Sequence, residues 1–250
     1  MELRLIRHAT LVLTLGGVRL LVDPMLSPAG AMAPIDNSAN PRRNPLVDLP
    51  VAESQLYSVD AVLLTHTHRD HFDAAAAERL PKDLPVFCQS EDEEKLRGLG
   101  FKQVTAVADT AMFQGLALTR TGGRHGTGAI GAQMAPVSGY VLRRQGEPVL
   151  YLAGDTVWCP EVEAALAVHR PEVVVLFAGA AQFLTGDPIT MTADDVARVC
   201  RKAPQARVVA VHMEVFNHCF LTRGLLHDAM TGQGLAGRVH IPADGELLRF

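Results

Sequence analysis

The stretch LLTHTHRDHFD, residues 63–73, constrains the fold of this chain more than any other segment. Its two leucines close the apolar run DAVLL, which is typical of a buried strand. A polar turn follows at once and supplies candidate metal ligands: His66, His68, Asp70 and His71. Imidazole nitrogens and carboxylate oxygens suit zinc, manganese or iron. The stretch therefore predicts a metal site carried on the end of a strand, and the alternative is a solvated turn that is merely rich in histidine.

Residues of the same metal-binding types recur at the ends of other apolar runs. Asp155 follows VLYLAG, His212 follows ARVVAV, and His125 lies in the glycine-rich loop GGRHGTG. Side chains on strand ends have rigid supports and can converge on one edge of a sheet, while glycines let the backbone of a loop approach closely. A metal site needs ligands from distant parts of the chain, so these three are candidates. The alternatives are a surface-loop histidine at 125, a turn aspartate at 155 and a core histidine at 212.

The apolar pattern predicts sheets covered by helices. Buried strands or hairpins are expected at 3–22, turning at Gly16-Gly17, and at 60–66, 85–89, 101–121, 139–156, 172–179, 206–212 and 245–250. Helices are expected within 73–80, 91–100, 159–170, 192–203 and 221–235, with Asp73 and Thr192 as N-caps. Buried strands flanked by amphipathic helices favour sheets with helices outside them. No linker divides the chain, so we expect a single domain over residues 1–250.

Residues 24–50 are proline-rich and carry no strand or helix pattern. Loops of this length inside a compact domain are usually functional or disordered. The apolar residues within the segment, together with Arg42 and Arg43, favour an ordered lid. Arginine binds phosphate and carboxylate by paired hydrogen bonds, so the two arginines are candidates for binding an anionic substrate. The alternative is a pair of solvated loop charges.

Composition limits the classes of function. The net charge is -4 and the pI about 6.2, which argues against a nucleic-acid partner because such proteins usually carry a basic patch. No apolar run is long enough to span a membrane, and the first residues lack the pattern of a signal peptide. The 4 cysteines are widely spaced, as expected of free thiols in a reducing compartment. We therefore expect a soluble, cytoplasmic protein.

The order of motifs resembles that of the metallo-β-lactamase-fold hydrolases. HTHRDH has the form H-x-H-x-D-H of their signature, and it stands between an early VDP and a later GDT and strand-end histidine. GGRHGTG, GDTVW and AVHMEVFNH are similar to the branch that includes the ascorbate-6-phosphate lactonases. The resemblance implies an α/β (α+β) fold, a four-layer αββα sandwich. It also implies two divalent metal ions at one edge, with zinc expected first and manganese or iron as alternatives.

The resemblance further implies a role for each motif residue. One ion would bind His66, His68 and His125; the other would bind Asp70, His71 and His212; and Asp155 would bridge them. Asp23 of VDP would orient the signature loop, and a histidine at the position of His8 approaches the site in related branches. The alternatives are an ordinary turn aspartate for Asp23 and a strand-edge histidine for His8.

The implied reaction is hydrolysis by a metal-bridging hydroxide. The substrate would be a small ester, lactone or phosphate ester, with a lactone as the first expectation. Asp70 and His218 are candidates for the acid that protonates the leaving group, and Asn217 is a candidate for substrate binding. A nuclease of the same fold and a non-catalytic metal-binding or ligand-sensing protein remain as alternatives. The substrate would be a small molecule, anionic if Arg42 and Arg43 bind it, and relatives in this branch commonly form homo-oligomers.

Overall fold

The computed structural model describes residues 1–250 and contains two seven-stranded sheets. The first has the order β14-β1-β2-β3-β4-β5-β6, with β1 (Glu2–Arg7), β2 (Thr10–Leu15), β3 (Val18–Val22), β4 (Ala61–Leu63), β5 (Pro85–Cys88), β6 (Gln103–Ala106) and β14 (Leu247–Arg249). The second has the order β13-β12-β11-β10-β9-β8-β7, with β7 (Thr110–Phe113), β8 (Leu116–Thr121), β9 (Gly139–Arg143), β10 (Leu150–Leu152), β11 (Val173–Phe177), β12 (Arg207–Val211) and β13 (Val239–His240).

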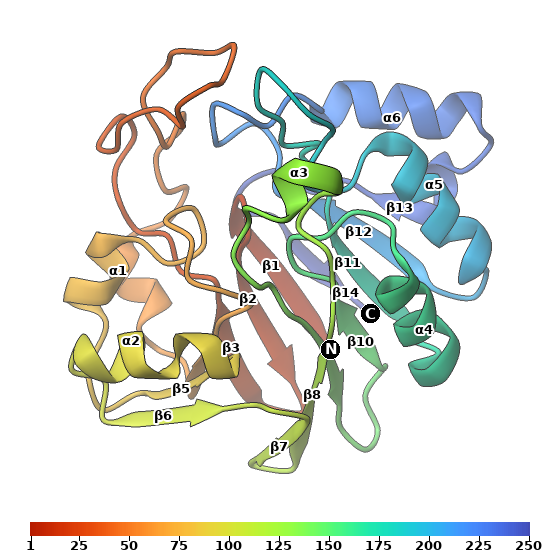
Figure 1. Ribbon diagram of the computed structural model, residues 1–250. Coiled ribbons are helices and arrows are strands. Elements are labelled where there is room, and N and C mark those ends of the chain that lie inside the picture. The colour runs from red at the N-terminus through yellow and green to blue at the C-terminus, as the bar shows by residue number, and fades with distance from the viewer.

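Helices cover the outer face of each sheet (Figure 1). The helices are α1 (Ala74–Arg79), α2 (Glu93–Gly98), α3 (Gly128–Gly131), α4 (Pro160–His169), α5 (Ala193–Lys202) and α6 (Arg223–Gly232), with short 3₁₀ turns at η1 (Glu53–Leu56), η2 (Ser90–Asp92) and η3 (Ala236–Arg238). α1 and α2 lie beside the first sheet, and α4, α5 and α6 lie beside the second. α3 lies apart from both groups, over the edge where loops gather.

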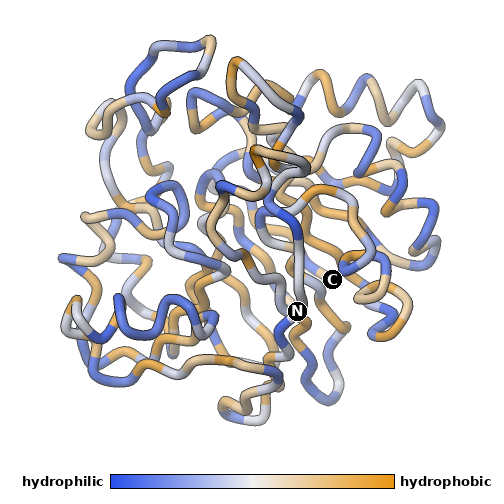
Figure 2. The backbone as a smooth tube through the Cα atoms, viewed as in Figure 1, coloured by the Kyte–Doolittle hydropathy of each residue, from blue (hydrophilic) through white to orange (hydrophobic).

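Three buried clusters of apolar side chains separate these layers. The inner one joins the facing sides of the two sheets, for example Leu63 of β4 and Leu152 of β10. The outer ones join each sheet to its helices, as Ala76 of α1 does on one side and Val196 of α5 on the other. Figure 2 shows the hydrophobic segments concentrated along the strands. Two sheets between two helical layers confirm the expected αββα sandwich.

Local signals in the sequence account for most element boundaries. Asp73 caps α1 by accepting a hydrogen bond from the backbone N–H of Ala76, and Thr192 caps α5 through a capping box with Asp195. Gly16 and Gly17 have positive φ and join β2 to β3 as predicted. Residues 3–22 hold parts of three strands, however, not two. The additional turn is at His8, whose φ of 57° is uncommon without glycine and gave no signal.

Parallel pairing brings the polar strand ends to one edge. β3 pairs in parallel with β4, and β10, β11 and β12 form a parallel run in the second sheet. Asp23 directly follows β3 and His212 directly follows β12, while Asp155 follows β10 by one short turn. Side chains at the carboxyl ends of parallel strands meet at the same edge of a sheet, which is where ligands bind in open α/β sheets.

The segment 24–50 contains no helix and no named strand, but it is tied to the rest of the molecule. Met32 and Asn44 form an isolated β-bridge within it. The fully buried guanidinium of Arg7 donates hydrogen bonds to the carbonyl oxygens of Met25, Ser27 and Val47. Among the helices, none combines the length and the apolar character that crossing a membrane would require.

Candidate metal centre

Asp23 holds the signature loop, residues 65–71, through hydrogen bonds from Thr65 and His71. Its Oδ1 accepts a hydrogen bond from the backbone N–H of Thr65 (2.8 Å), and its Oδ2 accepts one from Thr65 Oγ1 (2.6 Å). His71 Nδ1 lies 2.9 Å from the same Oδ2. A carboxylate can only accept, so Nδ1 of His71 carries a proton, and Nε2 is the ring nitrogen that faces the other candidate ligands. This is the arrangement in which a carboxylate orients a metal-binding histidine.

His66, His68 and His125 form a first cluster of imidazoles. Their ligand atoms all lie within 4.8 Å of one another, and His66 Nε2 is 3.0 Å from His68 Nδ1. His125 Nδ1 is 2.9 Å from the backbone oxygen of Ile189, so Nδ1–H donates there and Nε2 is free. The three rings come from the signature loop and from the loop between β8 and α3, which the fold brings together.

Asp70, His71 and His212 form a second cluster, and His8 joins it. The ligand atoms of these four residues also lie within 4.8 Å of one another. His212 Nε2 is 3.2 Å from His71 Nε2 and 3.6 Å from Asp70 Oδ2. His8 Nε2 lies 3.4 Å from Asp70 Oδ2, and its ring centroid is 3.7 Å from that of His212. The second cluster is thus more deeply enclosed than the first.

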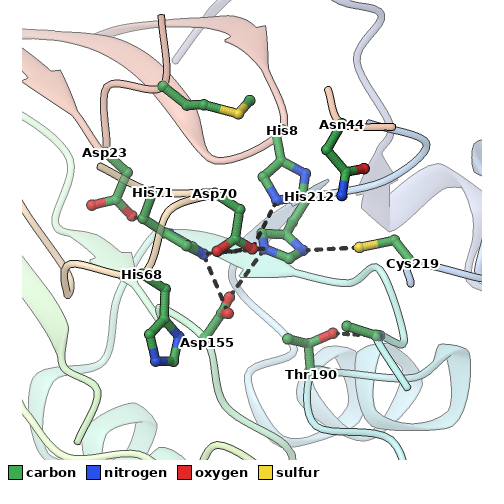
Figure 3. Close-up of polar contacts among 12 residues, drawn as sticks. His8, Asp23, Asn44, His68, Asp70, His71, Asp155, Thr190, His212 and Cys219 are labelled. Atoms are coloured by element: carbon green, nitrogen blue, oxygen red, sulfur yellow. Dashed lines mark hydrogen bonds and ion pairs between the residues drawn. The ribbon is translucent and has the colours of Figure 1, made fainter. Parts of the chain in front are cut away.

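Asp155 lies between the two clusters (Figure 3). Its Oδ2 is 3.2 Å from His71 Nε2 and 3.5 Å from His125 Nε2, and its Oδ1 is 3.3 Å from His212 Nε2. It is 2% exposed, and its Oδ1 has no hydrogen-bond partner. A buried carboxylate oxygen without a donor is costly unless a cation compensates it.

The donor set fits divalent cations. Imidazole nitrogens approach one another in both clusters, His66 Nε2 and His68 Nδ1 at 3.0 Å and His212 Nε2 and His71 Nε2 at 3.2 Å, an arrangement that a shared cation stabilises. Burial lowers the pKa of His66 and of His68, which keeps both neutral at pH 7 in the form that binds metals. Burial also acts on His71, but the carboxylates of Asp155 and Asp70 outweigh it and raise the pKa of His71 well above its usual value. In the metal-free protein, a proton on His71 therefore compensates part of the negative charge of Asp155 and Asp70.

The backbone around the clusters is held in unusual conformations. Asp23 has φ 42° and His212 has φ 69°, in the left-handed region that side chains other than glycine rarely adopt. Residues in such conformations cost about 1–3 kcal/mol each and persist where surrounding structure fixes them, often at functional sites. Here the backbone N–H of His212 donates to the oxygen of His8 at 2.9 Å, which ties the two loops together.

A cavity of about 260 Å³ opens beside the clusters, and both candidate acids line it. Asp70 and His218 both line it, as do His68 and His125. His218 is 6% exposed and its Nδ1 has no partner. Burial lowers the pKa of His218 to about 4, so its imidazole is neutral at pH 7.

Asn217 does not line this cavity. Its Oδ1 accepts from the backbone N–H of Ile35 (2.9 Å) and from Asn44 Nδ2 (2.8 Å), and its Nδ2 donates to the backbone oxygen of Asn40 (2.7 Å). These contacts anchor the segment 24–50. The geometry therefore gives Asn217 a role in loop structure, which differs from the substrate contact expected from its closeness to His218 in sequence.

Arg42 and Arg43 also lie outside the lining of the cavity. Both are exposed. Arg43 donates hydrogen bonds to the backbone oxygens of Gly30 (2.7 Å) and Ala31 (2.9 Å), so its guanidinium holds its own loop. The structure does not bring either arginine to the seven clustered residues.

Three supporting groups gave no sequence signal. Thr65 and the carbonyl of Ile189 hold histidines by hydrogen bonds, and Cys219 Sγ lies 3.7 Å from His212 Nδ1. Threonine, a backbone carbonyl and a lone cysteine occur throughout any chain, so nothing marked these three. Their positions relative to the histidines follow only from the folded backbone.

Comparison with known proteins agrees with this geometry. Residues 18–213 match the beta-lactamase superfamily domain. The chain belongs to this family. The structure of an isothiocyanate hydrolase from Delia radicum gut bacteria is 40% identical, with a TM-score of 0.96 over 100% of this chain and 99% of that one. The UPF0173 protein YddR of Bacillus subtilis is 37% identical over 100% of both chains.

A UPF0173 metal-dependent hydrolase of Azorhizobium caulinodans is 26% identical over 98% of both chains. With its His/Asp clusters, the protein is a metal-dependent hydrolase of the metallo-β-lactamase fold. This confirms the superfamily and the enzyme class predicted from the signature. The narrower resemblance to the ascorbate-6-phosphate lactonases is not confirmed and stays a prediction.

Proposed function

We propose that the two clusters bind two divalent ions, with zinc as the first expectation. One ion would be held by His66, His68 and His125, the other by Asp70, His71 and His212, with Asp155 shared between them. Bound ions of this kind lower the pKa of water toward 7 and polarise the electrophilic group of a substrate. Asp23, Thr65 and the carbonyl of Ile189 fix which ring nitrogens face the ions. Manganese and iron suit the same donors.

The lining of the cavity supports a small, uncharged substrate. Its volume of about 260 Å³ lies near the low end of ligand pockets, which run from roughly 300 to 1,000 Å³. Arg69 is the single lysine or arginine in the lining, and its guanidinium donates to the backbone oxygen of Pro34 at 2.9 Å. Arginine binds phosphate and carboxylate best with two parallel N–H donors, and Arg69 already uses Nη2 for the oxygen of Pro34. The cavity therefore favours a neutral electrophile over a phosphate ester.

The protonation of the candidate acids bears on the kind of electrophile. His218 is neutral at pH 7, and the surrounding histidines outweigh burial to hold the pKa of Asp70 well below its usual range. Neither group is a ready proton donor at neutral pH. Ester and lactone hydrolysis must expel an alkoxide, which needs a proton or a cation. Addition of water to a heterocumulene such as an isothiocyanate expels nothing in its first step.

We infer that the substrate is an isothiocyanate, in agreement with the name of the relative that is 40% identical over the whole chain. Water would add its oxygen to the central carbon of R–N=C=S, and its proton would go to nitrogen, which gives a thiocarbamate. The C–N bond would then break as the remaining acidic proton moves to nitrogen, releasing the amine R–NH₂ and carbonyl sulfide. His218 lines the cavity, and its neutral ring carries one N–H and one lone pair, either of which would hold the sulfur or nitrogen of the substrate.

The observation that carries this proposal is the convergence of seven His and Asp side chains beside a small cavity whose lining holds one arginine, Arg69. It is tested by metal analysis of the purified protein together with hydrolysis assays on benzyl isothiocyanate, a γ-lactone, p-nitrophenyl acetate and p-nitrophenyl phosphate. We expect amine release from the isothiocyanate to be the fastest reaction. His66→Ala should abolish it with loss of bound metal, whereas His169→Ala, on the surface end of α4, should change neither.

A lactone or ester is the second candidate, because it is also an uncharged electrophile and the same lining would accept it. Faster turnover of the γ-lactone than of the isothiocyanate would favour that candidate and would reject our choice of substrate. Full activity and full metal content in His66→Ala would reject the site assignment itself.

A further inference from the structure

The cavity has an apolar wall that comes from three separate loops. Ile35 comes from the segment 24–50, Met134 from the residues after α3, and Phe183 from the loop between β11 and α5. All three side chains are half-buried. They face the same cavity as the candidate ligands His68 and Asp70. The wall therefore lies beside the reacting centre and is accessible to solvent.

A second cavity of about 460 Å³ continues from this wall. It shares Gln133, Met134 and Phe183 with the first, and Ile130 of α3 adds a further apolar side chain. Its lining contains no charged residue. The two cavities thus adjoin at Met134 and Phe183.

Hydrogen bonds hold two of these loops in place: one bond joins the loop between β11 and α5 to the segment 24–50, and another lies within the loop between β11 and α5. The backbone N–H of Leu184 donates to the oxygen of Asn37 at 2.6 Å, and Gln182 Nε2 donates to the oxygen of Gly186 at 2.8 Å. In Figure 1 these loops gather around α3 at one end of the molecule. The centroid of the Phe183 ring lies 6.2 Å from that of His218. The apolar wall therefore lies next to His218, which lines the same cavity.

We propose that Phe183, Met134 and Ile35 form a subsite that binds an aryl or arylalkyl substituent of the substrate and so selects among isothiocyanates. The chemical identity of the reacting group rests on the proposed function, whereas the subsite rests on the lining alone. An aromatic substituent would cover the half-exposed apolar side chains. It would also gain edge-to-face contact with the ring of Phe183 and contact with the sulfur of Met134. The second cavity, of about 460 Å³, adds space on the other side of Met134 and Phe183 into which these side chains could move.

The test compares phenethyl isothiocyanate with ethyl isothiocyanate in the metal-loaded protein. We expect kcat/KM to favour the phenethyl compound by roughly tenfold or more, the range typical of added apolar groups in a fitted pocket. Phe183→Ala and Met134→Ala should each lower that ratio by about tenfold, mainly through the KM of the phenethyl compound. Leu184→Ala is the matched control, because Leu184 is 66% exposed and belongs to neither lining; its ratio should stay within about twofold. An unchanged ratio in both wall variants would overturn the subsite.

A binding measurement separates this inference from the proposed function. Phenethylurea and ethylurea carry the same substituents on a group that the enzyme should not turn over. Calorimetry should show tighter binding of phenethylurea, and Phe183→Ala should remove the difference. If the difference appears although no isothiocyanate is hydrolysed, the proposed reaction is wrong and the subsite stands. If isothiocyanates are hydrolysed but neither ratio responds to Phe183→Ala, the subsite is wrong and the reaction stands.

Discussion

The two His/Asp clusters and the mouth of the cavity, which is the apolar wall of Ile35, Met134 and Phe183, are built in opposite ways. The clustered histidines follow strands or tight turns, most are fully buried, and a second ring nitrogen often has its own partner, as in His71 with Asp23 and His125 with Ile189. The mouth is made of half-buried side chains on three loops that touch one another through few hydrogen bonds. The difference teaches that most candidate metal ligands stand on strand ends, whereas the apolar wall stands on loops, which vary more readily than strands; one of these loops also supplies the Ile189 carbonyl that orients His125.

The largest effect is expected at Asp155, which contacts both clusters. Asp155→Asn keeps the shape of the side chain but removes the charge that faces His71, His125 and His212. We expect kcat/KM to fall on the order of 10³-fold, as when a central charge-stabilising group is deleted, with loss of at least one bound ion. Elemental analysis and hydrolysis assays measure both. Asp109→Asn, on the exposed turn before β7, is the control, and retention of both ions by Asp155→Asn would contradict the shared role.

A smaller loss is expected when the support of a ligand is changed. Thr65 and His71 both donate hydrogen bonds to the Asp23 carboxylate. In Asp23→Asn, one of these donors would meet an amide N–H₂ and the other a weaker acceptor oxygen. Replacing such an orienting partner typically costs 10–100-fold in metal affinity. Competition with a chelator of known affinity measures this. Equal affinity in the variant would mean that the backbone alone orients His71.

The metal-free protein should show a pH dependence that the metal-loaded protein lacks. Burial alone would lower the pKa of His212, but the Asp155 carboxylate outweighs burial and raises that pKa from 6.5 to about 10. A raised pKa means that the folded protein holds a proton which the unfolded chain has lost. The resulting stability is fully present below pH 6.5 and is lost as pH rises toward 10. The free energy of unfolding should therefore fall by up to about 1.4 kcal/mol per pH unit in that window.

Urea unfolding between pH 6.5 and 10 measures this slope. Metal loading should flatten it, because a bound cation displaces the proton. His212→Gln should reduce it in the metal-free protein. Parallel curves for the metal-free and metal-loaded proteins would show that His212 does not exchange a proton for an ion.

The sequence predicted the clusters far better than the mouth, and the reason is physical. Metal ligands belong to a few residue types and need rigid supports, so histidines and aspartates after apolar strands are informative, as at His66, Asp155 and His212. The turn at His8 was missed because no glycine marks it. Phe183 and Met134 were missed because an apolar residue in a loop has the same appearance whether it lines a cavity or packs against a neighbour.

Asn217 is the opposite case: the sequence suggested a substrate contact, and the structure places the residue among loop contacts. Its position next to His218 suggested a substrate contact, but its partners Asn44 and Ile35 lie far away in sequence and could not be inferred. Asn217→Ala would leave the backbone N–H of Ile35 and the amide of Asn44 without acceptors. We expect the free energy of unfolding to drop by about 2 kcal/mol, with metal content unchanged and a modest rise in KM as the segment 24–50 loosens. Equal stability with a large loss of kcat would restore the substrate contact.

The smallest effect is expected at the exposed arginines of the same segment. Arg42 lies outside the cavity lining, and its side chain makes no hydrogen bond or ion pair in the structure. Exposed substitutions of this kind usually change stability by less than about 0.5 kcal/mol. Arg42→Ala should therefore leave kcat/KM for a neutral isothiocyanate within about twofold. Because an anionic substrate would depend on nearby positive charge, a large loss of activity in Arg42→Ala, increasing at low ionic strength, would argue that the mouth recognises charge and not an apolar substituent.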